Sequence, residues 1–440
     1  MTTPPMHMNR VEKDAPALPC PPVERASVPD SEPALDDPRA RLYHYYHTQR
    51  ILPTFADLKD EAALEQMAKG RFAFLRDKLR LPLRIFQELD LLEFGPDSGE
   101  HALIFAGLGA KLTLVEPNLQ AHARILAYFE RFQRQAALEA LLQADVEGLE
   151  QAPGFDASRR FSMVVAEGFI YTIQPNLRWL EVFSRLLRPD GLALFNYYER
   201  LGGMIELTLR ALHAGHRTQS GLEAEASAEQ LFSAKWDAIP HTRRFSSWVM
   251  DVLENPFVRR RTFISAGELL EDAAQVGLHL YSSWPLYEDA LQNYWHKKVL
   301  SNSARVAQAR AHTQRASLGY VCGIKAYDVG ENPAYTHQTC ERVLLEVDHF
   351  LDHPERAQAQ RVAEAYTQLA QQVASPTLFV EHAEDRTRAV QLFRGYAQAF
   401  EALANGQLQR LRSWCQQDAS FISEWGMPYH ASVLRKSDEK

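Results

Sequence analysis

The sequence has few cysteines, no long apolar run and no excess of basic residues. Its four cysteines form no close pair, so they provide neither a zinc-ligand spacing nor a disulfide framework: Cys20, Cys322, Cys340 and Cys415. No apolar run approaches the ~20 residues that span a bilayer, and the N-terminus carries no hydrophobic segment of the signal-peptide kind. The net charge of -8 disfavours nucleic acid and membrane surfaces as partners. We therefore expect a cytoplasmic protein that acts on a small molecule.

The N-terminal part of the chain differs in composition from the rest. Residues 1–38 are rich in proline and small polar side chains, which bury too little apolar surface to offset the entropy lost on folding. This composition predicts a disordered tail. In residues 39–88 apolar side chains recur every three or four positions, which predicts helices that lead into the first strand.

Residues 89–330 alternate short apolar runs with amphipathic segments, a pattern typical of a parallel sheet covered by helices. The alternation lapses at 200–262, where we expect a helical, aromatic-rich insertion that acts as a lid. It resumes with a helix after Ser265 and with two closing strands, at 278–285 and 319–327. Residues 331–440 have a helical period throughout and predict a separate C-terminal helical domain, through which the protein could form a homo-oligomer.

The stretch LLEFGPDSGEHAL, residues 91–103, is typical of a strand, a glycine turn and the start of a helix. Amides at a helix start are unpaired, and Gly95 and Gly99 would bring them close to an anionic group; alternatively the glycines form only a tight connection. Asp97 stands where such turns usually have a second glycine. Aspartate tolerates positive φ better than most residues, but its charge can repel or attract a cofactor. We expect a functional site of reduced affinity.

Acidic residues follow the next strands in order. Glu116 ends the second strand, where an acid can accept hydrogen bonds from both hydroxyls of a ribose. Asp145 follows the third strand and Glu167 the fourth. The turn in LLRPDGLALF then precedes the fifth strand, which ends at Glu199.

With these motifs in this order, residues 72–327 resemble the class I S-adenosylmethionine-dependent methyltransferases. The resemblance rests on LLEFGPDSGEHA, LTLVEPN, ADVEG and LLRPDGLALF. It implies an α/β fold with a Rossmann-like sheet and flanking helices, and S-adenosyl-L-methionine as cofactor. It also implies the binding residues: Glu93, Gly95, Ser98 and Gly99 for the methionine half, Glu116 for the ribose, and Asp145 with Val146 for the adenine.

A dinucleotide is the alternative cofactor, because its folds share the first strand–helix–strand unit and the acid after the second strand. That turn requires G-x-G-x-x-G, which GPDSGE matches poorly. The first stretch is similar to those of bacterial methyltransferases from surface-polysaccharide and secondary-metabolite clusters. This similarity suggests a small-molecule acceptor.

Candidates for the acceptor site lie at the carboxyl ends of the fourth and fifth strands. Glu167 is a candidate catalytic base or a plain hydrogen-bonding group, and Tyr171 is a second catalytic candidate. Asn196 ends the fifth strand with Tyr197 and Tyr198. These tyrosines form either pocket walls or packing contacts.

The remaining candidates are histidines and mixed basic and aromatic stretches in the second half of the chain. His213, His216 and His241 could act as acids or bases, although surface histidines are common. RRFSSWVMD and YWHKKVL, with His296, Lys297 and Lys298, could bind an anionic or sugar-derived acceptor, or the cations could complement a helix end. The second hypothesis for the whole chain is a non-catalytic scaffold that binds a partner protein through its C-terminal helices.

Overall fold

The computed structural model describes residues 48, 58–239, 244–288, 300–329 and 331–437. The predicted tail, residues 1–38, lies outside the described residues, as does most of the first part of the predicted 39–88 helices. The second part of that segment is helical. Helix α2, Glu61–Ala73, begins at Asp60, whose side chain accepts a hydrogen bond from the amide of Ala63, and short turns follow at Phe74–Lys78 and Leu83–Phe86.

Seven strands form one sheet in the order β3-β2-β1-β4-β5-β9-β6. Strands β1 to β5 are parallel, and β9 runs antiparallel to both β5 and β6. The strand bounds are Asp90–Phe94 (β1), Lys111–Val115 (β2), Leu138–Leu142 (β3), Phe161–Ala166 (β4), Leu187–Tyr198 (β5), Leu278–Trp284 (β6) and Tyr429–Lys436 (β9). This arrangement confirms the predicted α/β fold with a Rossmann-like sheet.

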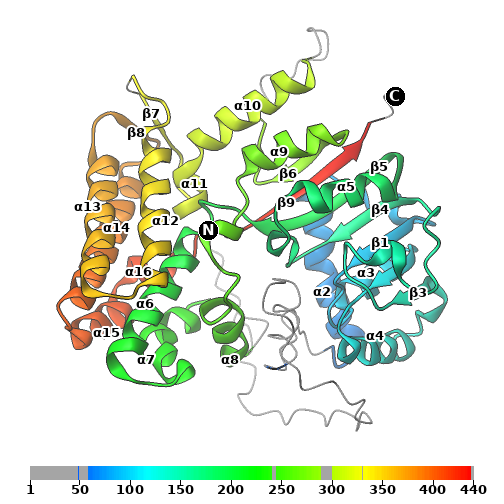
Figure 1. Cartoon of the computed structure of the whole chain (residues 1–440), viewed down its shortest axis with the longest axis horizontal. Coiled ribbons are helices and arrows are strands. Elements are labelled where there is room, and N and C mark those ends of the chain that lie inside the picture. Colours follow the sequence, from blue (N-terminus) through cyan, green and yellow to red (C-terminus); the bar gives the residue numbers. More distant parts are fainter. Residues whose placement is uncertain (1–47, 49–57, 240–243, 289–299, 330, 438–440) are drawn as a thin grey trace, which may run out of the picture.

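Helices cover both faces of the sheet (Figure 1). Helices α2, α3 and α4 pack on one face, and α5 and α9 pack on the other. The bounds of the last four are Glu100–Gly107 (α3), Leu119–Arg131 (α4), Leu177–Leu186 (α5) and Ala266–Gln275 (α9). Glu93 is in register with Val165, whose side chain is buried under α2 to α4. Because neighbouring strands in register present the same face, Glu93 points toward α2 and α3.

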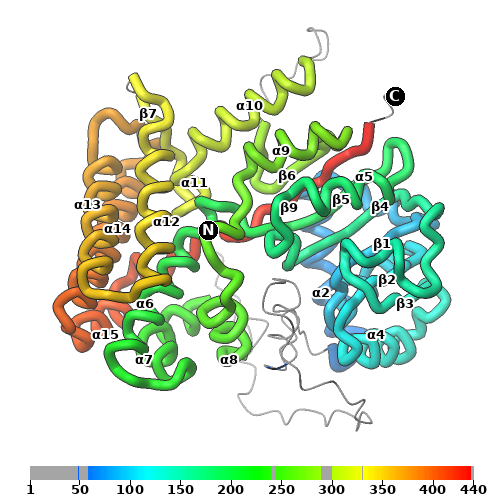
Figure 2. Tube along the Cα trace, in the orientation of Figure 1, coloured from blue at the N-terminus to red at the C-terminus, as the bar shows by residue number. Residues whose placement is uncertain are grey.

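The closing strand of the sheet comes from residues 429–436 (red in Figures 1 and 2). The strand predicted at 319–327 is wrong: Ser317–Cys322 is helix α11, and Ala326–Asp328 (β7) pairs with Leu378–Val380 (β8) in a separate ribbon. A short apolar run fits a buried helix as well as a strand, and here the helix formed. The boundary predicted at 331 also fails for β9, which follows the helices in sequence but lies in the sheet.

The predicted insertion and the C-terminal helices form one helical body. Helix α6, Met204–Ser220, packs against α12 and α14, and α7, Ala224–Asp237, packs against α15 and α16. The bounds of the C-terminal helices are Tyr335–Asp352 (α12), Arg356–Ala374 (α13), Ala383–Ala404 (α14), Leu408–Gln417 (α15) and Ala419–Ser423 (α16). The lid role of residues 200–262 and association through the C-terminal helices stay predictions.

The segment between α16 and β9 joins this helical body to the sheet. The buried Lys235 of α7 donates hydrogen bonds to the carbonyls of Phe421 and Glu424 and lies over the rings of Phe421 and Trp425. Further along, the amide of Glu199 donates to the carbonyl of Pro428 at 2.9 Å. Contacts from the helical body therefore fix the chain where it enters β9.

Deleting residues 429–440 should abolish cooperative folding. The deletion opens the sheet between β5 and β6 and removes the side chains of Val433 and Leu434 from the core, where both are fully buried. Thermal unfolding followed by circular dichroism would measure this, with deletion of residues 438–440 as the control. A truncated protein that melts within a few degrees of the full chain would contradict the role given to β9.

Candidate active site

An ion pair links the end of β4 to the helix before β1. The Arg71 guanidinium contacts both carboxylate oxygens of Glu167, with 3.1 Å between Nη1 and Oε1, and both side chains are 8% exposed. The Arg71 guanidinium carbon lies over the rings of Phe74 and Phe105, at 5.6 and 5.4 Å from their centroids. Burial alone would raise the pKa of the Glu167 carboxyl, but the charges and hydrogen bonds of Arg71 and His101 together outweigh burial, and the pKa falls to about 2. Glu167 is thus a poor proton acceptor.

Glu93 lies beside this pair without a cation of its own. Its side chain is buried, and Oε2 has no hydrogen-bond partner among the described residues. Burial raises the pKa of the Glu93 carboxyl to about 8, and the nearby charge of Glu167 adds to the shift while Arg71 opposes it. The carboxyl is therefore largely protonated at neutral pH.

The glycine turn has the backbone conformation that the sequence predicts. Gly95, Asp97 and Gly99 have φ values of 61°, 51° and 91°, in the left-handed region that glycine and aspartate tolerate. A Cβ atom on Gly95 would lie 2.7 Å from the Phe169 ring, so close approach also requires glycine there. Asp97 thus replaces a glycine without disrupting the turn.

Ser98 and Gly99 use their polar groups within the turn. The buried Ser98 hydroxyl donates to Glu100 Oε2 at 2.6 Å, and the Gly99 amide donates to the Pro96 carbonyl at 2.8 Å. Gly99 is also the residue before α3. The structure therefore places both residues at the start of the helix, as the sequence predicts, and their contact with a cofactor stays a prediction.

Glu116, directly after β2, is tied to the same turn. Its Oε2 accepts a hydrogen bond from the Asp97 amide at 3.2 Å, and its Oε1 accepts one from the Asn118 amide at 2.8 Å. Burial raises the pKa of the Glu116 carboxyl to about 8, the Asn118 amide opposes this shift, and the Asp97 charge adds to it. The Asp97 carboxylate therefore acts on the residue predicted to bind the ribose.

Asp145 and Val146 lie beyond the end of β3. Asp145 Oδ1 accepts hydrogen bonds from the amides of Glu147 and Gly148, at 3.1 and 2.6 Å, which closes a local turn. Val146 is buried in the core cluster. Their predicted role beside an adenine stays a prediction.

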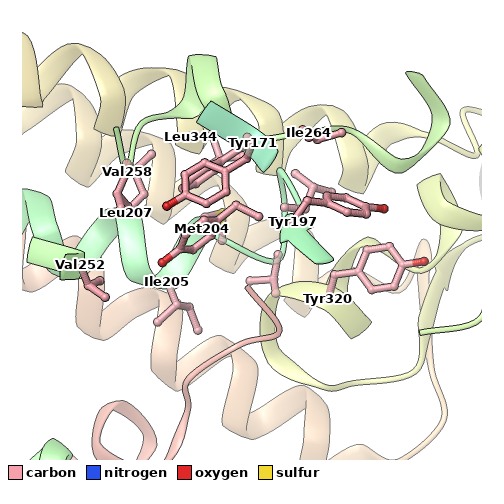
Figure 3. Packing of buried hydrophobic residues seen from close by; sticks show 14 of the residues in the cluster. Tyr171, Tyr197, Met204, Ile205, Leu207, Val252, Val258, Ile264, Tyr320 and Leu344 are labelled. Carbon is pink, nitrogen blue, oxygen red and sulfur yellow. The ribbon is translucent and has the colours of Figure 1, made fainter. Parts of the chain in front are cut away.

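The tyrosines predicted near the acceptor are packed in the core. Tyr171 is 3% exposed, and its ring meets that of Tyr198 edge-on at 4.8 Å. The Tyr197 hydroxyl bonds that of Tyr287, and the Tyr198 hydroxyl donates to Glu206 Oε2 at 2.6 Å. Figure 3 shows Tyr171 and Tyr197 among apolar side chains of the helical body. These contacts favour the packing interpretation over pocket walls, and the catalytic role of Tyr171 stays a prediction.

Two further side chains, those of Asn196 and His101, lie near Glu167. Asn196 of β5 accepts a hydrogen bond from the Gly168 amide through Oδ1, and its Nδ2 lies 3.4 Å from Glu167 Oε1. His101, on the first turn of α3, places Nδ1 3.6 Å from Glu167 Oε2, and its side chain is one-third exposed. Sequence reasoning missed Arg71, which belongs to no motif, and His101, which lies within the stretch LLEFGPDSGEHA but was given no role. The available signal was that Arg71 precedes the first strand and that His101 directly follows the glycine turn.

Two of the other predicted histidines lie in the helical body. His213 and His216 are buried between α6 and α7, where they contact the Ala224 carbonyl and the Ser227 hydroxyl. His241, His296, Lys297 and Lys298 lie outside the described residues. Within the described part of the chain, no group of three or more histidine, cysteine or acidic side chains could hold a metal ion.

The sheet order, the antiparallel strand beside β5 and the acids at the carboxyl edge define the class I methyltransferase fold. A family model described as a methyltransferase domain matches residues 66–283. The matched residues form a class I S-adenosylmethionine-dependent methyltransferase domain, and S-adenosylmethionine is its cofactor. The dinucleotide alternative is therefore wrong, and of the two hypotheses for the whole chain the family match favours the enzyme.

Two solved structures show what the chain is similar to at low identity. A proposed sarcosine dimethylglycine methyltransferase from Galdieria sulphuraria is 9% identical, with a TM-score of 0.32 over 90% of this chain and 98% of that one. The N-methyltransferase NodS from Bradyrhizobium japonicum is 16% identical, with a TM-score of 0.26 over 35% of this chain and 73% of that one. No curated protein matches the chain. None of the described helices combines the length and apolar character of a membrane span.

The residues at the site fit the methionine end of the cofactor. Two buried polar atoms lack partners among the residues described here, the acceptor Glu93 Oε2 and the donor Arg71 Nε. A methionine group carries one ammonium and one carboxylate, which are a donor and an acceptor of matching charge. Unpartnered buried polar atoms are costly, so a ligand that pairs both of them would be favoured.

Glu167→Gln should lower the free energy of unfolding by about 3 kcal/mol at pH 7, because it leaves the Arg71 charge buried and unpaired. The pKa of Glu167 is lower in the folded chain than in the unfolded chain. Its contribution is thus present above about pH 4.5 and is lost as the pH falls toward 2. Urea unfolding at pH 7 and pH 3 would measure this.

The matched control is Glu150→Gln, which breaks a surface pair with Arg185 at 3.0 Å. This control should change stability by less than about 1 kcal/mol. Equal effects of the two substitutions would contradict the buried-pair interpretation.

Proposed function

We propose that the protein transfers a methyl group from S-adenosylmethionine to a small-molecule acceptor at the carboxyl edge of β4 and β5. The observation that carries this proposal is the charge arrangement of Glu93, Arg71 and Glu167 beside the glycine turn. When bound, the cofactor supplies a methyl carbon activated by a sulfonium. The chain itself has to bind and orient the cofactor and the acceptor, and to exclude water from them.

Arg71 and Glu93 are the proposed ligands of the methionine end. Arg71 offers its guanidinium to the carboxylate, and Glu93 offers Oε2 to the ammonium. Gly95 has no side chain, which lets the Phe169 ring lie against the turn, and its contact with the cofactor stays a prediction. Glu167 holds Arg71 in place through both of its oxygens.

Glu116 is the proposed ligand of the ribose. Each of its oxygens already accepts one backbone amide, and each retains a lone pair for a hydroxyl. The two amides fix the carboxylate before the ligand arrives, so little entropy is lost on binding. Asp145 and Val146 stay the predicted neighbours of the adenine.

The acceptor is proposed to lie beside Glu167, Gly168 and Asn196. The sequence left two roles open for Glu167, that of a catalytic base and that of a hydrogen-bonding group. Its pKa of about 2 and its pairing with Arg71 support the hydrogen-bonding role. An anionic or sugar-derived acceptor stays a prediction, since Lys297 and Lys298 lie outside the described residues.

Isothermal titration with S-adenosylmethionine would test the cofactor site. Glu116→Ala should weaken binding about tenfold to a hundredfold, the loss expected for hydrogen bonds to a charged group. Circular dichroism would check that the Glu116→Ala protein is still folded. Binding unchanged by this substitution would contradict the assignment of the ribose ligand.

Asp97→Asn should tighten binding several-fold, because it removes the charge that disfavours ionised Glu116 and keeps a residue that tolerates positive φ. Asp97→Gly should act in the same direction. Weaker binding by both variants would show that the Asp97 charge helps the cofactor to bind. The same titrations would measure these variants.

The acceptor can be found by incubating the protein with methyl-labelled S-adenosylmethionine and fractionated metabolite extract. Label should enter a small molecule with the wild-type protein and not with Glu116→Ala. Label that enters only macromolecules would contradict the small-molecule acceptor. Mass spectrometry of the labelled fraction would then show whether the product is anionic.

A further inference from the structure

Two buried carboxyls, Glu93 and Glu167, share one guanidinium at the methionine end of the site. Arg71 contacts both oxygens of Glu167, which leaves Glu93 Oε2 without a partner among the described residues. Glu93 is 3% exposed, so water does not stabilise its charge. A buried carboxyl in this position keeps its proton until a cation arrives.

The charged groups that act on Glu93 come from the elements packed around it. Arg71 lies on α2, Glu167 follows β4, and Glu100 lies on α3. His101 of α3 is near Glu167 and one-third exposed. The two other acids disfavour ionisation of Glu93, and the one guanidinium is already engaged. An ionised Glu93 would therefore have no positive charge of its own to pair with among these groups.

We propose that binding of the methionine end of S-adenosylmethionine releases one proton from Glu93, so that cofactor binding and deprotonation are coupled. The inference rests on the proposed function of the site. On binding, the O–H bond of Glu93 breaks and its proton passes to the solvent. The carboxylate then accepts a hydrogen bond from the α-ammonium, which stays protonated.

This coupling makes cofactor affinity depend on pH. The pKa of Glu93 in the free protein is about 8, so below that value binding has to expel a proton. Affinity should rise by up to about tenfold per pH unit between pH 6 and 7.5. Glu116 has a raised pKa as well, but its proposed partners are the neutral ribose hydroxyls, so a test must separate the two carboxyls.

The contributions of Glu93 and Glu116 can be distinguished by comparing two ligands. S-adenosylhomocysteine carries the amino acid group, whereas 5′-methylthioadenosine carries only the ribose and the adenine. Isothermal titration at pH 6.5 in two buffers of different ionisation enthalpy counts the protons released with each ligand. The proteins are the wild type, Glu93→Gln and the matched control Glu116→Gln.

We expect S-adenosylhomocysteine to release about one proton more than 5′-methylthioadenosine from the wild type and from Glu116→Gln. With Glu93→Gln the difference should disappear. Equal proton release by the two ligands on the wild type would overturn the proposal, as would a difference that persists in Glu93→Gln. If that variant fails to bind, the comparison of ligands on the wild type decides. If neither ligand binds any protein, the proposed function itself fails.

Discussion

The register of the parallel strands is the constraint on which the site depends. Glu93 is paired with Val165, and Val165 with Leu194, so these positions present one face of the sheet. Glu167 and Asn196 lie two residues beyond Val165 and Leu194 and share that face. Arg71 of α2 meets them there. A shift of one residue in any of these strands would send the charged groups into the apolar core on the opposite side.

The electrostatics of the site follow from this placement. Three acids, Glu93, Glu116 and Glu167, are all buried, yet only Glu167 has a cation, and only its pKa falls. Burial raises the pKa of the other two carboxyls to about 8. In a site with this balance of charges, the two unpaired carboxyls resist ionisation while no positive charge is bound nearby. Such a site favours a ligand that carries a positive charge. The same balance is consistent with a cofactor that carries an ammonium and a sulfonium.

Much of the fold could be predicted from the sequence, because its signals are local. Alternating apolar runs gave the first five strands, and the spacing of glycines with Asp97 gave a turn with positive φ. Arg71 could not be found in this way, since a single arginine on a helix becomes significant only when packing brings Glu167 to it. Nor could β9, because pairing with β5 joins segments more than two hundred residues apart.

The packing of the tyrosines shows the same limit at the acceptor side. Tyr171, Tyr197 and Tyr198 follow strands at the expected edge, but the helical body covers them, and their hydroxyls and rings are used in internal contacts. The position of a residue in a strand gave its location along the sheet. Its solvent access depended on helices that come later in the chain.

The late position of β9 has a consequence for biosynthesis. As the ribosome synthesises the chain from its N-terminus, β5 and β6 emerge long before the strand that lies between them. During that interval both present unpaired backbone edges, which can associate with other chains. The helical body emerges in the same interval and brings the segment before β9 into position. Completion of the catalytic sheet is therefore postponed until the C-terminal helices α12 to α16 have been synthesised.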